Sequence, residues 1–166
     1  MSETNLKVRT LENRSMALGL AVEYLMKKPA FARLPFGHWS RVLTGQIRRG
    51  HYAFVVDEKR VVGFGGWALM TEAEAEAWVT GAPGSTEILG TAGDCIAVNA
   101  WAADTPAANR LIMESAVSAA KDYRMLYAKR EYPNGRSRPL RFKVEDFVDS
   151  EAFKALELYY MSPGRG

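Results

Sequence analysis

The stretch Tyr52-Ala-Phe-Val-Val-Asp-Glu-Lys-Arg-Val-Val-Gly-Phe-Gly-Gly-Trp-Ala-Leu69 decides the fold of this chain. Its two halves, 52–56 and 61–69, are rich in β-branched and aromatic residues and flank the polar turn 57–60, which is the pattern of a β-hairpin. Outside the hairpin, apolar residues recur at helical spacing. The sequence therefore predicts a sheet that is covered by helices.

Helices are predicted on both sides of this hairpin. The first covers 11–28 and stops before Pro29. A second follows the turn 34–37 and ends at Gly50, with one face formed by Trp39, Val42, Leu43, Gln46 and Ile47. After the hairpin, Thr71 is expected to begin a helix that ends at Gly81.

The remainder of the chain continues the alternation of strands and helices. Strands are expected over 95–101, 125–129 and 140–144, a helix from Pro106 to about Tyr123, and a short helix from Ser150. This order predicts a fold of the α/β or α+β class, with a mixed, mostly antiparallel sheet flanked by helices. The length of 166 residues predicts a single domain spanning 1–166.

Composition excludes several classes of protein. One cysteine excludes a disulfide framework or a cysteine-rich zinc site, and two histidines leave little material for a metal centre. No apolar run approaches the roughly 18 residues of a membrane-spanning helix, and residues 1–10 lack the apolar region of a signal peptide. The expectation is a soluble protein of the reducing cytoplasm, with no metal and no permanently bound cofactor.

One junction between a strand and a helix is a candidate site. The strand 95–101 leads through Ala102 and Asp104 to Thr105, which is placed to cap a helix beginning at Pro106. A helix N-terminus at the end of a strand offers free N–H groups to a phosphate, a phosphopantetheine or a developing oxyanion. The alternative is an ordinary structural junction, because most α/β proteins contain such capped helices.

The candidate general bases are His38 and His51, since an unperturbed imidazole titrates near pH 6.5. Each could equally be structural. Trp67 and Trp101 lie near strand ends, where they could line a channel for an acyl chain or belong to the core.

Basic residues form two clusters. The stretch 129–143 holds six basic residues and one acidic residue, and Arg33, Arg41, Arg48 and Arg49 form the second cluster. Such clusters attract acidic partners. Nucleic acid is not favoured, because no zinc-finger, RNA-recognition or phosphate-loop motif accompanies the charge.

The order of these segments resembles a known family. Four stretches of the chain resemble the RTX toxin-activating lysine acyltransferases. They are the run Pro29-Ala-Phe-Ala-Arg-Leu-Pro35, the helix end and strand from Gln46 to Val56, the strand Val62-Gly-Phe-Gly-Gly-Trp-Ala-Leu69 and the element Ile96-Ala-Val-Asn-Ala-Trp-Ala-Ala-Asp104. This family has a GNAT-like fold, and the resemblance covers about residues 20–147. It rests on pattern and order rather than on a single motif.

The resemblance implies transfer of a fatty acyl group from acyl carrier protein to a lysine side chain. The donor would be acyl-phosphopantetheine on the carrier protein in preference to acyl-CoA, docked at Arg41, Arg48 and Arg49 and bound along Trp67, Trp101, Ala102 and Thr105. The acceptor would be a lysine or ornithine of a protein or of a ribosomal peptide. The oligomeric state stays open, with a homodimer as one option.

The chain departs from this family where catalysis is expected. The family's histidine and aspartate correspond to Phe31 and Asn99. Replacement catalytic residues are His38, His51 and Asp104, together with Asn99, whose amide could orient the amine or hold the oxyanion. The alternatives are a catalytically silent protein that binds the carrier or a toxin-like partner, and an acetyl-CoA-dependent GNAT acetyltransferase, although 101–108 contains no glycine for a pyrophosphate loop.

Overall fold

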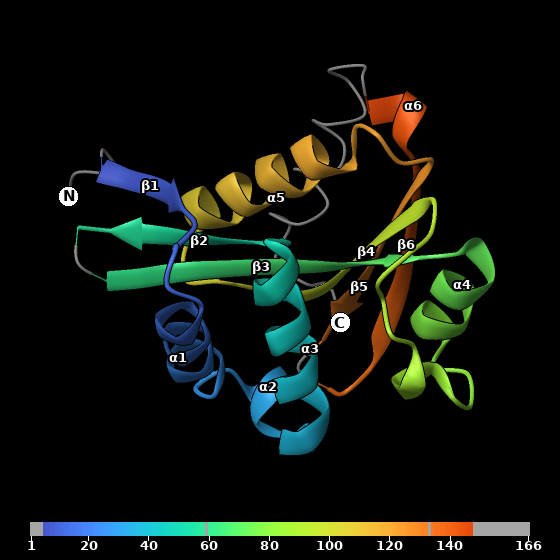
Figure 1. Cartoon of the computed structure of the whole chain (residues 1–166), viewed down its shortest axis with the longest axis horizontal. Coiled ribbons are helices and arrows are strands. Elements are labelled where there is room, and N and C mark those ends of the chain that lie inside the picture. Colours follow the sequence, from blue (N-terminus) through green and yellow to red (C-terminus); the bar gives the residue numbers. More distant parts are fainter. Residues whose placement is uncertain (1–4, 59, 133, 148–166) are drawn as a thin grey trace. The chain divides into compact units, whose positions relative to one another are not determined.

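Helices and strands alternate in the computed structural model, which describes residues 5–58, 60–132 and 134–147 (Figure 1). The helices are α1 (Arg14–Leu25), α2 (Pro29–Ala32), α3 (Phe36–Arg49), α4 (Glu72–Thr80), α5 (Pro106–Ala120), α6 (Val144–Phe147) and the 3-10 turn η2 (Ser85–Glu87). The strands are β1 (Leu6–Arg9), β2 (Tyr52–Asp57), β3 (Arg60–Met70), β4 (Cys95–Ala103), β5 (Met125–Glu131) and β6 (Ser137–Lys143).

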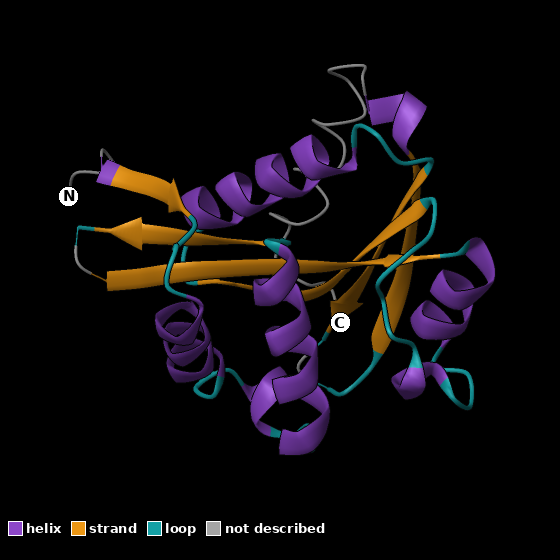
Figure 2. Ribbon diagram, in the orientation of Figure 1, coloured by secondary structure: helices purple, strands orange, loops and turns teal. Residues whose placement is uncertain are grey.

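The six strands form one mixed sheet in the order β1-β2-β3-β4-β5-β6 (Figure 2). The pairs β1–β2, β2–β3 and β5–β6 are antiparallel, and β4–β5 is parallel. The predicted hairpin is confirmed as β2 and β3, with a register shift between Val55 and Val56. The α+β class and the mostly antiparallel sheet are therefore as the sequence predicts.

The two helix ends that were predicted at glycines are also confirmed, whereas the first helix ends at Leu25 rather than at Lys28, and the helix from Pro106 ends at Ala120 rather than near Tyr123. Gly50 and Gly81 end α3 and α4 in the left-handed conformation, with φ of 75° and 68°, which glycine adopts without the steric cost that other residues meet. Thr71 caps α4 in a reciprocal arrangement with Glu74, in which each side chain accepts a hydrogen bond from the other residue's backbone N–H.

Several elements differ from the sequence prediction. The strand β1 was not predicted, because a short and mostly exposed edge strand carries little apolar pattern. The first helix begins at Arg14 rather than at Leu11, since the Asn13 side chain caps it. The strand β4 continues through Ala103, and Val144 begins α6 rather than ending a strand. The helix predicted from Ser150 lies outside the described residues.

The described residues group into two compact units. The first consists of the described parts of Met1–Trp67 and Asn99–Ala116, and the second of those of Ala68–Val98 and Val117–Gly166.

Helices pack on both faces of the strands of the first unit (Figure 1). On one face, Leu25 of α1 and Leu43 of α3 belong to the same apolar cluster as Phe54 and Phe64 of β2 and β3. On the other face, Ile112 of α5 packs with residues of β2 and β3, which include Val55 and Val62. The strands β2 and β3 are therefore buried on both sides.

The glycines of β3 permit this double packing. A Cβ atom on Gly65 would lie 2.6 Å from Cγ2 of Ile112, and one on Gly63 would lie 2.9 Å from its Cδ1. A Cβ atom on Gly66 would instead collide with the side chain of Gln46 in α3. Since side chains alternate between the faces of a strand, the glycine run brings α5 close on one face and α3 close on the other.

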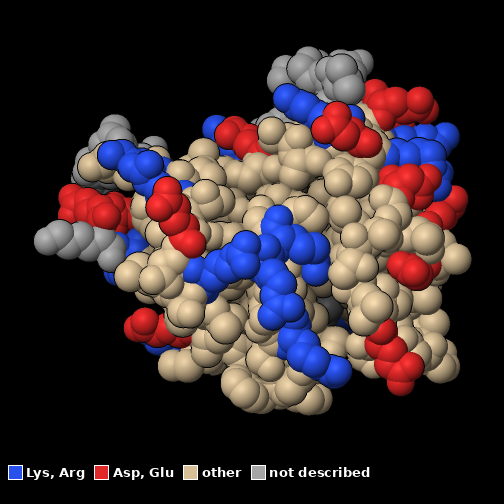
Figure 3. Space-filling model, viewed as in Figure 1, with Lys and Arg blue, Asp and Glu red and all other residues tan. Residues whose placement is uncertain are grey.

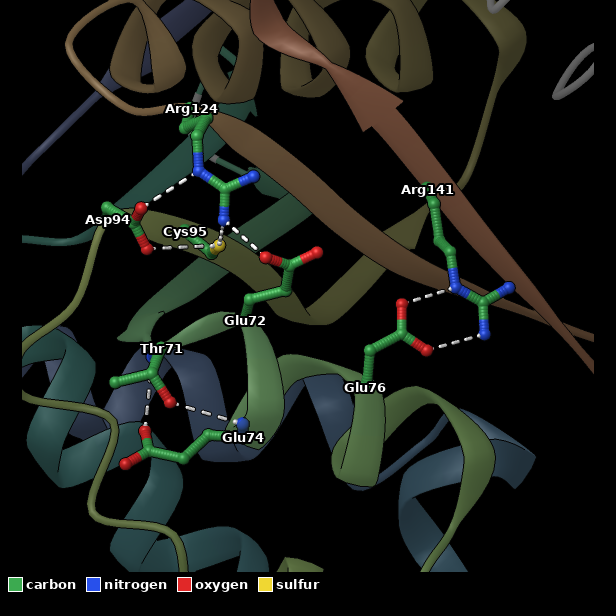
Figure 4. A network of polar contacts seen from close by, with 8 residues as sticks. All are labelled: Thr71, Glu72, Glu74, Glu76, Asp94, Cys95, Arg124 and Arg141. Atoms are coloured by element: carbon green, nitrogen blue, oxygen red, sulfur yellow. Dashed lines mark hydrogen bonds and ion pairs between the residues drawn. The ribbon is translucent and has the colours of Figure 1, made fainter.

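In the second unit, α4 packs against the strands β4 and β5. Ala75 and Val79 share an apolar cluster with Cys95, Ala97 and Tyr127. Ion pairs tie α4 to the strands: the Arg141 guanidinium donates to both oxygens of Glu76 at 2.7 and 2.9 Å (Figure 4).

We expect Gly65→Ala to lower the free energy of unfolding by about 1–3 kcal/mol, because its methyl group would overlap Ile112. Gly19→Ala is the matched control, since a Cβ there meets no atom within 4 Å and should stabilise α1 by up to about 1 kcal/mol. Urea denaturation measures both. Combining Gly65→Ala with Ile112→Ala should cost less than the sum of the single changes, and strict additivity would contradict the overlap.

Candidate functional site

A pair of side-chain amides joins α3 to β4 in the first unit. The Nε2 group of Gln46 donates a hydrogen bond to Oδ1 of Asn99. Gln46 is fully buried and lies over Gly66, whose missing side chain leaves room for it, whereas Asn99 is half-buried. The second amide atom of Gln46, Oε1, has no hydrogen-bond partner among the described residues. A buried polar atom without a partner is uncommon and calls for an explanation.

The amide pair determines which end of Asn99 is presented to a ligand. Because Gln46 donates to Oδ1, the NH2 group of Asn99 is the end that remains to donate. Asn99 as a whole is half-buried, unlike Gln46, which is fully buried. The arrangement can hold an oxygen that gains negative charge during a reaction.

The strand is irregular next to Asn99. Asn99 contacts Gln46 of α3, and Ala100 belongs to the apolar cluster that contains Leu43 of α3. Consecutive residues of a regular strand point to opposite faces. Because Asn99 and Ala100 both lie on the α3 side of β4, the strand has a bulge-like distortion at 99–100. Such a distortion redirects side chains and is frequent beside functional sites.

His51 lies at the start of β2, immediately after α3. Its backbone N–H donates to the carbonyl of Gln46 at 2.9 Å, and its ring stacks on that of Trp67 with centroids 6.2 Å apart. The Nε group of Arg49 approaches its Nδ1 at 3.4 Å. Burial and the charge of Arg49 lower the pKa of His51, so the imidazole is neutral at physiological pH.

Neither candidate histidine lies beside Asn99. Gly66 faces Gln46, so Trp67 and the imidazole of His51 stacked on it lie on the opposite face of the strands. His38 is in the first turn of α3, eight residues before Gln46, or about 12 Å along the helix axis. The structure thus brings Asn99 together with Gln46, and with neither of the two histidines.

The junction after β4 has the predicted cap. Oγ1 of Thr105 accepts a hydrogen bond from the N–H of Ala108 at 3.1 Å. Asp104 accepts from the hydroxyl of Tyr24 at 2.9 Å and pairs with Lys28 at 2.5 Å. Burial acts to raise the pKa of Asp104, but the hydrogen bonds from Lys28 and Tyr24 outweigh it and lower the pKa.

Asp104 is therefore an ionised structural partner and a weak candidate for a base. Its charge at the N-terminus of α5 also opposes the binding of a second anion there. The junction accordingly suits a neutral thioester better than a phosphate.

The predicted acyl-binding residues lie on different faces of the first unit. Trp101 shares a cluster with Ile112 of α5, and its indole N–H donates to Asn109 at 2.8 Å. Ala102 instead packs with the cluster on the α1 and α3 face. Trp67 and Trp101 thus share the α5 face, and Ala102 does not.

Basic side chains gather over α3 (Figure 3). Arg41 and Arg48 are exposed and lie seven residues apart, on the same side of the helix. Arg49 is half-buried and folds back over Gly45, where its Nη1 is 2.9 Å from the position of a Cβ atom. Of the three predicted docking residues, Arg41 and Arg48 therefore face solvent, and Arg49 turns toward His51.

The second unit contains a separate network of charges around Arg124 (Figure 4). Its guanidinium pairs with Asp94 at 2.9 Å and with Glu72 at 2.7 Å, beside the buried Cys95. Burial and the neighbouring Asp94 raise the pKa of the Cys95 thiol to about 11. The network connects α4 to the strands and leaves the thiol protonated, so it is structural.

Within 5–58, 60–132 and 134–147, no group of three or more histidine, cysteine, aspartate or glutamate residues could hold a metal ion. The same residues contain no helix long and apolar enough to cross a membrane. No protein-family model matches the chain, and neither does any curated protein. The toxin-activating family and its activity therefore stay predictions.

Gln46 is the site residue that the sequence did not single out. Its helical spacing places it on the apolar face of α3, among residues typical of a core such as Leu43 and Ile47. An uncharged polar residue on such a face, opposite a glycine-rich strand, is the signal that could have identified it.

We expect the single thiol to be unreactive in the folded protein, because Cys95 is buried and the raised pKa leaves little thiolate at about pH 8. Alkylation by iodoacetamide, followed by intact mass, should be at least about 100-fold slower in buffer than in urea. Similar rates in the two solvents would show that Cys95 is accessible.

Stability should fall with acidification through His51. In the folded chain its pKa is lowered, whereas the unfolded chain takes up a proton near pH 6.5. Below that pH the unfolded state binds more protons, so the free energy of unfolding decreases. The urea concentration at the midpoint of unfolding should decrease between about pH 7.5 and pH 5.5, and this decrease should be smaller for His51→Gln than for the parent. Equal losses would mean that the folded protein does not lower this pKa.

Proposed function

We propose that the protein is an N-acyltransferase that moves a fatty acyl group from acyl carrier protein to a lysine or ornithine side chain of a protein or peptide. The observation that carries this proposal is the amide pair of Gln46 and Asn99 at the irregular point of β4. The pair occupies Oδ1 of Asn99 and leaves its NH2 group as the end of this side chain that can donate. Acyl transfer from a thioester needs such a donor, because the carbonyl oxygen becomes an oxyanion in the tetrahedral intermediate.

In this reaction the neutral amine attacks the thioester carbonyl and forms a C–N bond. The carbonyl electrons move to oxygen, where Asn99 and backbone N–H groups of 99–101 stabilise the charge. The C–S bond then breaks and the thiol of the carrier leaves, with the proton of the amine passing to the sulfur through solvent. The products are an amide and the free carrier thiol.

Positioning is the main source of rate in this proposal. A lysine amine with a pKa near 10.4 is neutral in only about one molecule in a thousand at pH 7.4. His51 and His38 are both separated from Asn99, so neither is placed to take the proton beside the oxyanion site. A thioester is already activated, and holding it against an amine supplies much of the barrier reduction.

The exposed guanidinium groups of Arg41 and Arg48 suit an acidic carrier protein. They project from the same side of α3, the helix that holds Gln46. This common element links a docking surface to the amide pair. Electrostatic attraction of this kind raises the rate of encounter and weakens with salt.

Acyl transfer can be tested by intact-mass analysis of lysine and ornithine peptides incubated with the protein and with acyl carrier protein carrying fatty acyl chains. The parent should add one acyl group to an amine. Asn99→Ala should reduce the rate about 100-fold or more under conditions where circular dichroism shows the variant to be folded. Because it also removes the acceptor of the buried Gln46 amide, it should lower the free energy of unfolding by about 1–3 kcal/mol. His51→Gln and His38→Gln are matched controls that should stay within about tenfold of the parent.

Three outcomes would change this view. A loss of about 100-fold in either histidine variant would assign that histidine as the base. Salt-sensitive binding of the carrier without any acylated product would instead indicate a silent binding protein, an alternative favoured by the separation of both histidines from Asn99. Product formed from acetyl-CoA but not from the carrier would indicate an acetyltransferase.

A further inference from the structure

The segment 26–37 combines exposed apolar side chains with a one-sided charge. It connects α1 to α3 through α2, and three of the six large hydrophobic residues that are exposed in the described chain belong to it: Met26 at 51%, Leu34 at 41% and Phe36 at 67%. The three lie within eleven residues of one another in the sequence, and exposed apolar residues that gather in one region of a folded protein mark a binding surface.

The charge around this segment has one sign. Residues 24–56 contain six basic residues and no acidic residue, although acidic residues make up 19 of the 166 in the whole chain. Lys28 is paired with Asp104 from outside this stretch. Lys27 and Arg33 are exposed within the segment, and Arg41 is exposed one turn further along α3.

The apolar side chains of the segment are open to solvent. Leu34 and Phe36 flank the exposed Pro35, and the rings of Phe36 and the buried Trp39 form a T-shaped pair with centroids 5.7 Å apart. In Figure 1, α2 and the first turn of α3 lie at the end of the first unit away from its strands. Nothing in the described parts of this unit covers them, as their exposure shows.

We propose that the segment 26–37 binds the surface of an anionic lipid bilayer. Phe36, Leu34 and Met26 would enter the boundary between headgroups and acyl chains, and Lys27, Arg33 and Arg41 would contact the phosphates. Apolar area and basic charge act together in such peripheral binding, and each contributes separately. Lipid binding here is independent of acyl transfer, and either can fail without the other.

An acidic protein is the competing partner for a basic surface. An acidic protein would be bound chiefly by the basic side chains. A bilayer would also bury the exposed aliphatic and aromatic side chains, which adds to the free energy of binding. Substituting the apolar residues therefore separates the two partners.

Binding is measured by co-flotation of the full chain with vesicles of phosphatidylcholine, alone or mixed with phosphatidylglycerol. The parent should float with the mixed vesicles and not with phosphatidylcholine alone. Leu34→Ser combined with Phe36→Ser should weaken binding about tenfold or more. Phe36→Leu should bind within about threefold of the parent, which shows that an apolar group rather than the fold is required.

Matched controls come from the second unit. Leu89 is 84% exposed, so Leu89→Ser removes a similar apolar group and should leave vesicle binding unchanged. Lys27→Glu with Arg33→Glu should abolish binding, whereas Arg136→Glu with Lys143→Glu makes the same change in net charge and should largely retain it.

The proposal fails if the serine pair binds mixed vesicles as tightly as Leu89→Ser does, or if both charge pairs weaken binding equally. It also fails if the parent does not bind the vesicles but binds polyglutamate, which would indicate that the segment binds an acidic protein. Circular dichroism of every variant confirms that the fold is retained.

Discussion

Close approach of helices to both faces of β3 is the constraint on which the first unit depends. Gly63 and Gly65 admit Ile112 of α5 on one face, and Gly66 admits Gln46 of α3 on the other. Larger residues at these positions would separate the layers and would also displace the amide of Gln46 from Asn99. Packing and the candidate chemistry thus share one cause, which is the absence of side chains along a short part of one strand.

The elements that the sequence predicts well are those with strong local signals. The hairpin, the glycine ends of α3 and α4, and the Thr105 cap follow from side-chain alternation, from the left-handed conformation and from the N-cap hydrogen bond. The strand β1 has no such signal, because an exposed edge strand is defined by its partner β2. Tertiary pairing, which the sequence does not display locally, decides such elements.

The site was harder to predict than the fold. Sequence spacing identified Asn99, but the contact that orients it comes from Gln46, which is 53 residues away along the chain and lies on an apolar helix face. Likewise, the sequence offers both His51 and Asn99 as catalytic candidates, yet their side chains lie on opposite faces of the strands. Asn99 contacts Gln46, which faces Gly66 of β3, whereas His51 stacks on Trp67, the next residue of that strand. A sequence shows the type of each residue and the spacing at which apolar residues recur. A site depends also on which faces of several helices and strands are turned toward one another.

Oε1 of Gln46, which has no hydrogen-bond partner in the part of the chain that the structure describes, has a thermodynamic consequence. A buried carbonyl that has left water without finding a donor lowers stability by about 1–3 kcal/mol. An aliphatic residue of similar size would remove this penalty, so selection for thermal robustness alone should disfavour glutamine at this position. If glutamine persists among natural variants of the chain, the retained penalty is a measure of how strongly function requires the amide.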